Sequence, residues 1–191
     1  MGETWLYHYD LATKQQSMEW RHSGLPCPKI FQVQKSAGEV LALIFCDQDG
    51  ILLIDYLPKG QTINVEYYSS LLVQLKDNLK AKCRRKVTKA VLFLHDNASA
   101  HRVATYKKLA YLGFQCLDHP PYSPDLALSD YHLFPGLKKQ LKGHHFMSNA
   151  EVIAAVEIWM DGQTSEFFLS GLQKSEQWAN KCIELRGKYV E

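Results

Sequence analysis

The stretch that decides the fold is Ala90-Val91-Leu92-Phe93-Leu94-His95-Asp96-Asn97. Its first five residues are apolar without alternation, which predicts a strand buried on both faces in the middle of a sheet. Asp96 then follows the carboxyl end of that strand, at the edge of an α/β sheet where ligands and reacting groups collect. A buried carboxylate there needs a positive partner, and a divalent metal ion is one. Taken alone, an aspartate that caps the next helix is the commoner interpretation.

A second carboxylate changes that balance. Asp130 stands at the start of a predicted helix over 130–141, where backbone amides and the helix dipole favour negative charge. The alternative is that Ser129, Asp130 or Asp125 is a simple N-cap. One aspartate after a strand and one at a helix start can converge on a hard cation such as Mg²⁺ or Mn²⁺, which binds oxygen ligands. We therefore expect Asp96 and Asp130 to be metal ligands and catalytic residues, in a site of the kind that assists phosphoryl transfer.

Outward from these two acids, the pattern alternates between strands and helices. Strands are predicted over 40–46, 51–57 and 114–117, helices over 64–79, 103–112 and 130–141, and further helical periodicity from about residue 149 onward. Residues 5–20 resemble a hairpin, and an Asp-Gly turn joins the strands at 40–46 and 51–57. Trp159 and Trp178 are expected in the core. This order of elements predicts an α/β fold, a mixed sheet covered by helices.

Composition limits the class of protein. The chain has 191 residues, of which 46% are hydrophobic and 22% charged, enough to bury the core of one globular domain. Its five cysteines are scattered and form no Cys-x-x-Cys pair, which predicts reduced thiols and an intracellular protein. No run of about 18 apolar residues occurs, so we expect no membrane span.

The net charge of +2 conceals an uneven distribution of basic residues. Seven of them lie between Lys76 and Lys89, where a solvated helix face and a patch that contacts DNA phosphates are equally good interpretations. The segment 21–38 is a long loop with prolines and glycines, either functional or a floppy surface loop. Candidate DNA contacts from these stretches and from the end of the central strand are Arg21, Lys29, Lys35, Arg84, Arg85, Lys86 and His101.

The motifs around both acids resemble those of mariner-family DNA transposases. They are Phe93-Leu94-His95-Asp96-Asn97-Ala98-Ser99-Ala100-His101, His119-Pro120-Pro121-Tyr122-Ser123-Pro124-Asp125-Leu126 and Ser129-Asp130-Tyr131-His132-Leu133-Phe134. The segments 56–60 and 178–185 also match that family in order. The resemblance implies a ribonuclease-H-like core over 1–146, in which 21–38 is a clamp-like insertion, and a C-terminal helical extension over 147–191 packed on the core.

The resemblance also implies a chemistry and shows a departure from it. Members of the family use three acids to bind two Mg²⁺ or Mn²⁺ ions, cut DNA at transposon ends and join it to a target. Asp96 resembles the second acid and Asp130 the third. The first lies in a Gly-Asp-Glu-Thr-Trp strand, whereas this chain begins Met1-Gly2-Glu3-Thr4-Trp5. We therefore expect a glycine in place of the acid at position 2, with Glu3 on the opposite face of the strand.

Partners and location follow from the same resemblance. It implies DNA as partner (transposon ends and target), a homodimer through the 21–38 loop, no membrane, and a place in the nucleus. No counterpart of the family's two helix-turn-helix units precedes Met1. Three hypotheses stay open: an impaired metal-dependent transposase core, a non-catalytic DNA-binding or dimerisation module, and a truncated product without function.

Overall fold

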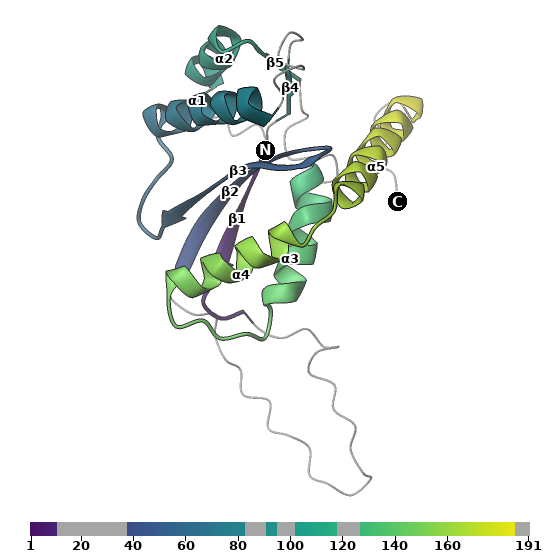
Figure 1. Ribbon diagram of the computed structural model, residues 1–191. Coiled ribbons are helices and arrows are strands. Elements are labelled where there is room, and N and C mark those ends of the chain that lie inside the picture. The colour runs from purple at the N-terminus through teal and green to yellow at the C-terminus, as the bar shows by residue number, and fades with distance from the viewer. Residues whose placement is uncertain (11–37, 83–90, 95–101, 118–126, 186–191) are drawn as a thin grey trace, which may run out of the picture.

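The computed structural model describes residues 1–10, 38–82, 91–94, 102–117 and 127–185 (Figure 1). In chain order the elements are β1 (Gly2–Tyr7), β2 (Glu39–Asp47), β3 (Gly50–Pro58), α1 (Val65–Lys82), β4 (Val91–Phe93), α2 (Arg102–Tyr111), β5 (Phe114–Cys116), η3 (Ser129–Leu133), α3 (Phe134–Leu141), α4 (Asn149–Asp161) and α5 (Ser165–Glu184). Within these ranges, none of the helices combines the length and apolar character needed to cross a membrane.

Strand β2 is the centre of an antiparallel sheet in the order β1-β2-β3. The predicted turn between β2 and β3 is confirmed, because the Asp47 carboxylate accepts hydrogen bonds from the backbone N–H groups of Asp49 (2.8 Å) and Gly50 (3.0 Å). Gly50 has a φ of 138°, a conformation that side chains other than glycine rarely adopt. The turn residues therefore fix the pairing next to the turn, and the register shifts once further along, between Phe45 and Cys46.

Both faces of β2 are buried, and each faces its own hydrophobic cluster. Ala42 and Ile44 point to a cluster with α3, α4 and the start of α5, while Leu43 and Phe45 point to a second cluster with α1, β4, α2 and β5. Figure 1 shows α1, α2, β4 and β5 grouped apart from α3 and α4, with the sheet between them. The sheet is thus the middle layer, and side chains that alternate along β2 reach both outer layers.

The α1, α2 and β5 segments follow the sequence pattern closely. Asn64 caps α1 by accepting a hydrogen bond from the Tyr67 backbone N–H (2.7 Å), and Leu72 lies fully buried on its inner face. The predicted helix over 103–112 is α2, and Gly113, with a φ of 80°, ends it before β5. β4 pairs with β5 in parallel, as expected for strands joined by a helix.

Two local predictions are wrong. Leu92 of β4 is 60% exposed, so this strand is not buried on both faces; among the described residues its ladder partner is β5 alone. Trp178 is 36% exposed, because it lies in the part of α5 that extends beyond the core, whereas Trp159 packs against the first cluster. β1 pairs with β2, from Gly2 opposite Ile44 onward, and the predicted hairpin of β1 with 17–20 stays a prediction, because 17–20 lie outside the described residues.

The division of the chain at residue 146 stays a prediction. Helix α4 contributes Val152 and Val156 to the cluster that also holds Leu6 of β1. His8, just after β1, shares a 2.6 Å hydrogen bond with Asn149 at the start of α4. The segment predicted as an extension therefore shares its core with the first strand.

Candidate metal and DNA site

Most of the predicted site residues lie outside the described part of the chain. These are Asp96 and the candidate DNA contacts Arg21, Lys29, Lys35, Arg84, Arg85, Lys86 and His101. Their predicted roles stay predictions. Asp130 is described, and the residues before Asp96, up to Leu94, are described as well. The site can therefore be built from Asp130 and from the strand that leads to Asp96.

Asp130 is half-buried in the first turn of η3, a π-helical turn that runs directly into α3. The Phe134 backbone N–H donates to the Ser129 carbonyl five residues earlier, and the Asp130 N–H donates to Ala127 (2.9 Å). The N-cap is Leu128, without a capping side chain, so the alternative that Ser129 or Asp130 caps this helix is wrong. Such π-turns are rare and are frequent at functional sites.

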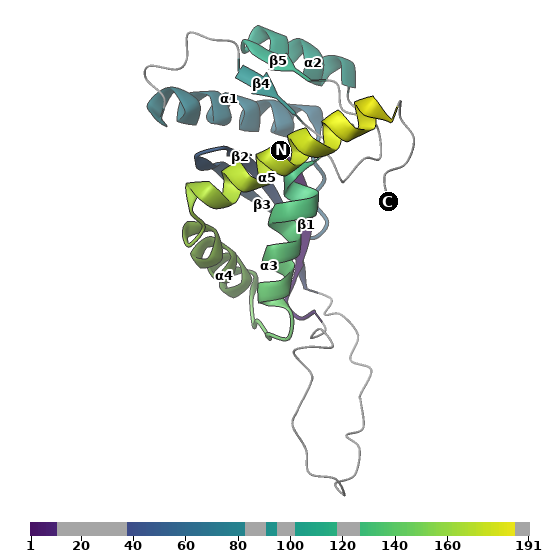
Figure 2. The ribbon, with the colours of Figure 1, turned by 90° about the vertical axis from the view of Figure 1, so that its right-hand side faces the viewer.

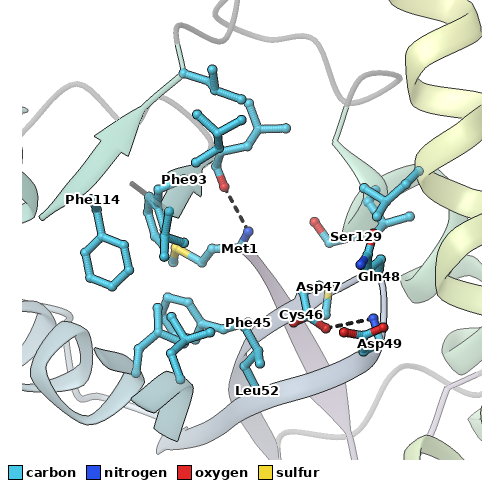
Figure 3. A pocket seen from close by; sticks show the side chains of 18 of the residues that line it. Met1, Phe45, Cys46, Asp47, Gln48, Asp49, Leu52, Phe93, Phe114 and Ser129 are labelled. Atoms are coloured by element: carbon cyan, nitrogen blue, oxygen red, sulfur yellow. Dashed lines mark hydrogen bonds between the residues drawn. The ribbon is translucent and has the colours of Figure 1, made fainter. Parts of the chain in front are cut away.

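The start of β1 lies between Asp130 and the strand that leads to Asp96. The Met1 nitrogen donates a hydrogen bond to the carbonyl of Leu94 (2.9 Å), two residues before Asp96 (Figure 3). Burial lowers the pKa of the Met1 amine, while Cys46 and Asp130 act in the opposite direction. Because Met1 touches the end of β4 and Gly2 packs against Ser129, these two parts of the chain approach one another at the head of β1.

The same region borders an apolar cavity of about 600 Å³. Leu94 and Ser129 both line it, together with Met1, Phe45 of β2 and Phe93 of β4, and Figure 3 shows Met1 between Phe93 and Ser129. Burial raises the pKa of the Cys46 thiol in its wall. The carboxyl end of β4 and the start of η3 thus face one common space.

Gly2 is buried against Ser129, the residue before Asp130. A Cβ at position 2 would lie 2.1 Å from the Ser129 Oγ and 2.4 Å from its Cβ, closer than atoms pack. The Ser129 side chain, itself 4% exposed, therefore fills the space that a side chain at position 2 would enter. Position 2 does point to the neighbourhood of Asp130.

Glu3 is exposed while its neighbours Gly2 and Thr4 are buried, which confirms the expected alternation along β1. Glu3 nevertheless shares a groove with Asp130, and Thr4, which points to the other face of β1, lines that groove as well. Burial, and next the negative charge of Glu3, raise the pKa of Tyr68 on α1. Two carboxylates therefore border one groove, although only one of them was expected near it.

Helix α5 holds η3 in place. The Tyr131 hydroxyl donates a hydrogen bond to the Gly171 carbonyl, and the His132 ring stacks on Phe167, with its Nε2 3.0 Å from the Phe167 carbonyl. A Cβ on Gly171 would meet the Leu128 side chain at 2.2 Å and the His132 ring at 2.8 Å. One turn of α5 thus packs against the residues on either side of Asp130. The contacts of His132 are those of a residue that holds two helices together.

Comparison with known proteins settles the family. A family profile described as "Transposase (partial DDE domain)" matches residues 10–89. The mariner Mos1 transposase of Drosophila mauritiana is 30% identical over 192 residues, covering 99% of this chain and 55% of that protein. The crystal structure of the catalytic domain of Mos1 mariner transposase is 34% identical, with a TM-score of 0.75, over 85% of this chain and 80% of that chain. The chain belongs to the mariner transposase family.

The crystal structure of the Mos1 mariner paired end complex with Mn matches this mariner chain over its full length, with 30% identity and a TM-score of 0.88. The chain spans 55% of the length of that structure. The predicted fold class is confirmed: the mariner chain is an α/β protein with the ribonuclease-H-like fold of the Mos1 catalytic domain. Helices flank the β1-β2-β3 sheet as expected.

The described residues of the mariner chain offer the kind of ligand atom that a hard divalent cation binds. Mg²⁺ and Mn²⁺ prefer oxygen ligands, and carboxylates supply them. Asp130 is such a donor, and Glu3 borders the same groove. Among the described residues no three His, Cys, Asp or Glu side chains gather into a metal-binding group. A complete ligand set thus requires a residue from outside the described ranges, where Asp96 lies.

The sequence interpretation missed three lysines of the mariner chain. Lys138, Lys139 and Lys142 line the groove beside Asp130. Their signal was present, since Asp130, Phe134, Lys138 and Lys142 recur at intervals of four and such residues share one helix face.

Proposed function

We propose that this chain is the catalytic core of a mariner-type transposase, which carries out metal-dependent DNA strand cleavage and strand transfer, and that the glycine at position 2 impairs its activity. One observation carries the proposal. The head of β1 lies beside both acids' segments: Gly2 packs against Ser129, the residue before Asp130, and Met1, just before β1, bonds to Leu94, which leads to Asp96. The similarity to the Mos1 paired end complex with Mn supports the same chemistry.

Asp96 and Asp130 would hold Mg²⁺ or Mn²⁺. When bound, such ions activate an attacking oxygen and stabilise the oxygen that leaves a phosphodiester. The chain's own contribution is to fix the acids: η3 and the turn of α5 that packs on it hold Asp130, and β4 is the strand that precedes Asp96 in sequence. The fixed placement matters because a shift of about 1 Å at a reacting centre costs on the order of 100-fold in rate.

The impairment follows from Gly2. A third acid would complete the site of this family, and glycine has no side-chain carboxylate to offer. Its Cα packs against Ser129 so closely that no side chain fits there without a rearrangement. Glu3 lies at the edge of the same groove and is the nearest described carboxylate in sequence, but its side chain leaves β1 on the other face.

The packing of Gly2 on Ser129 also favours a second candidate function. A chain that has filled the space of the first acid with a neighbouring side chain can keep the fold and the DNA-facing surface without catalysis. In that case the protein is a non-catalytic DNA-binding or dimerisation module derived from a transposase. The first function includes DNA cleavage and the second does not, whereas DNA binding is part of both.

The partners and the location are part of the proposal. DNA, as transposon ends and target, is the substrate. The similarity to the Mos1 transposase and to its paired end complex supports this choice. The 21–38 loop is the proposed contact of a homodimer, and the nucleus is the proposed location because the substrate is chromosomal DNA. A fluorescently tagged chain that stays out of the nucleus would contradict the last point.

Nicking of supercoiled DNA in the presence of Mn²⁺ tests the proposal. We expect slow nicking by the unchanged protein, stopped by a chelator and lost in both Asp96→Ala and Asp130→Ala. A Lys174→Ala variant, changed at an exposed position of α5, is the matched control and should keep the activity. Nicking that persists in Asp96→Ala would contradict the assigned site. Salt-sensitive DNA binding with no nicking under any condition would favour the non-catalytic module.

A further inference from the structure

A groove of about 600 Å³ runs between the edge of β1 and the helix formed by η3 and α3. Figure 2 shows α3 running alongside β1. The groove is lined by Glu3, Thr4, Asp130, Phe134, Pro135, Lys138, Lys139 and Lys142. It therefore connects Asp130, at one end of the helix, with lysines at the other.

The charges in the groove are ordered along the helix. Asp130 lies in the first turn of η3, while Lys138 and Lys139 lie in the last turn of α3 and Lys142 follows directly after it. At a rise of about 1.5 Å per residue, Lys138 and Lys142 stand about 6 Å apart along the axis of α3. Phosphates on one strand of a duplex rise by about 3.4 Å per nucleotide, so this spacing suits two phosphates of one strand that lie two nucleotides apart.

The lining of the groove includes a buried polar side chain, that of Thr4. Thr4 is 4% exposed, and its hydroxyl has no hydrogen-bond partner among the described residues. Buried hydroxyls are nearly always paired, because an unpaired one costs about 1–3 kcal/mol. This observation is independent of the lysines and points to a ligand with hydrogen-bonding oxygens.

Helix stabilisation is the competing explanation for the lysines. Cations in the last turn of a helix interact favourably with its dipole, and Lys138 and Lys139 stand in that turn. This explanation predicts a small loss of stability on mutation and no effect on a ligand. It accounts neither for the shared groove with Asp130 nor for the unpaired Thr4 hydroxyl.

We propose that this groove binds the phosphodiester backbone of a DNA strand that leaves the Asp130 end of the site, with Lys138 and Lys142 each contacting a phosphate. The proposal rests on the proposed function, since it names the path of the same substrate. It adds Lys138 of α3 and Lys142, which follows α3, to the DNA contacts expected from the sequence.

A salt titration of DNA binding tests this path. Affinity for a short duplex is measured between low and moderate salt for the unchanged protein, for Lys138→Gln/Lys142→Gln, and for Lys107→Gln/Lys174→Gln. The last variant removes the same charge from exposed positions on α2 and α5. Thermal unfolding of all three proteins separates loss of stability from loss of contacts.

For the groove variant we expect an affinity lower by on the order of tenfold at low salt, and a slope of log affinity against log salt that is smaller by about 2, since each phosphate contact contributes about 0.9. The control variant should keep the slope of the unchanged protein. Equal slopes for both variants would overturn the groove while leaving DNA binding intact. Absence of salt-sensitive binding by the unchanged protein would overturn the proposed function itself, and the groove with it.

Discussion

Gly2 and Ser129 meet at the point where the family's first acid is expected. Glycine leaves position 2 without a carboxylate. The contact with Ser129 makes that loss hard to reverse, because a Cβ at position 2 would lie 2.1 Å from the Ser129 Oγ. Ser129 is short and buried, so its side chain cannot swing aside as a long exposed one would.

Gly2→Asp alone should therefore be destabilising. Overpacking of this kind costs about 1–3 kcal/mol in the free energy of unfolding, which denaturant titration measures. Gly2→Asp/Ser129→Gly should recover part of that loss and nick DNA with Mn²⁺ faster than the unchanged protein. Ser129→Gly alone is the control for the loss of the serine. If Gly2→Asp is as stable as the unchanged protein, the packing described for position 2 is incorrect.

At the scale of the element, one turn of α5 fixes the π-turn that carries Asp130. Gly171 lets the two helices approach closely enough for Tyr131 to reach its carbonyl and for His132 to stack on Phe167. The approach depends on the absence of a side chain at position 171. The position of Asp130 is thus set by a residue 41 positions away in sequence.

Gly171→Val should separate α5 from η3. We expect the free energy of unfolding to fall by about 1–3 kcal/mol, since the added atoms meet Leu128 and His132. Gln173→Val places the same residue at an exposed site of the same helix and should change stability by about 0.5 kcal/mol or less. Equal effects of the two substitutions in thermal and chemical unfolding would show that Gly171 makes no close contact.

Elements governed by nearby residues could be predicted from the sequence. The 47–50 turn depends on Asp47 and Gly50, and the ends of α1 and α2 depend on Asn64 and Gly113. The partner of β1 could not be predicted, because strand pairing depends on side chains distant in the chain. The exposure of Leu92 has the same cause, since burial of a strand is decided by what packs on it.

At the scale of the whole molecule, spacing and motifs indicated the two acids, while tertiary contacts supply the rest of the site. Met1 bridges to the end of β4, Ser129 fills the space beside Gly2, and Lys142 enters the groove from the far end of α3. None of these contacts has a local signature, apart from the four-residue spacing that leads from Asp130 to Lys142.

The most direct test is a crystal structure of the protein grown with Mn²⁺, in which anomalous scattering locates the ion. The account predicts a manganese peak bound by the carboxylates of both Asp96 and Asp130, at oxygen distances of about 2.1 Å. The peak should disappear in crystals of Asp130→Asn. Carboxylates of Asp96 and Asp130 that lie too far apart to share an ion would contradict the account.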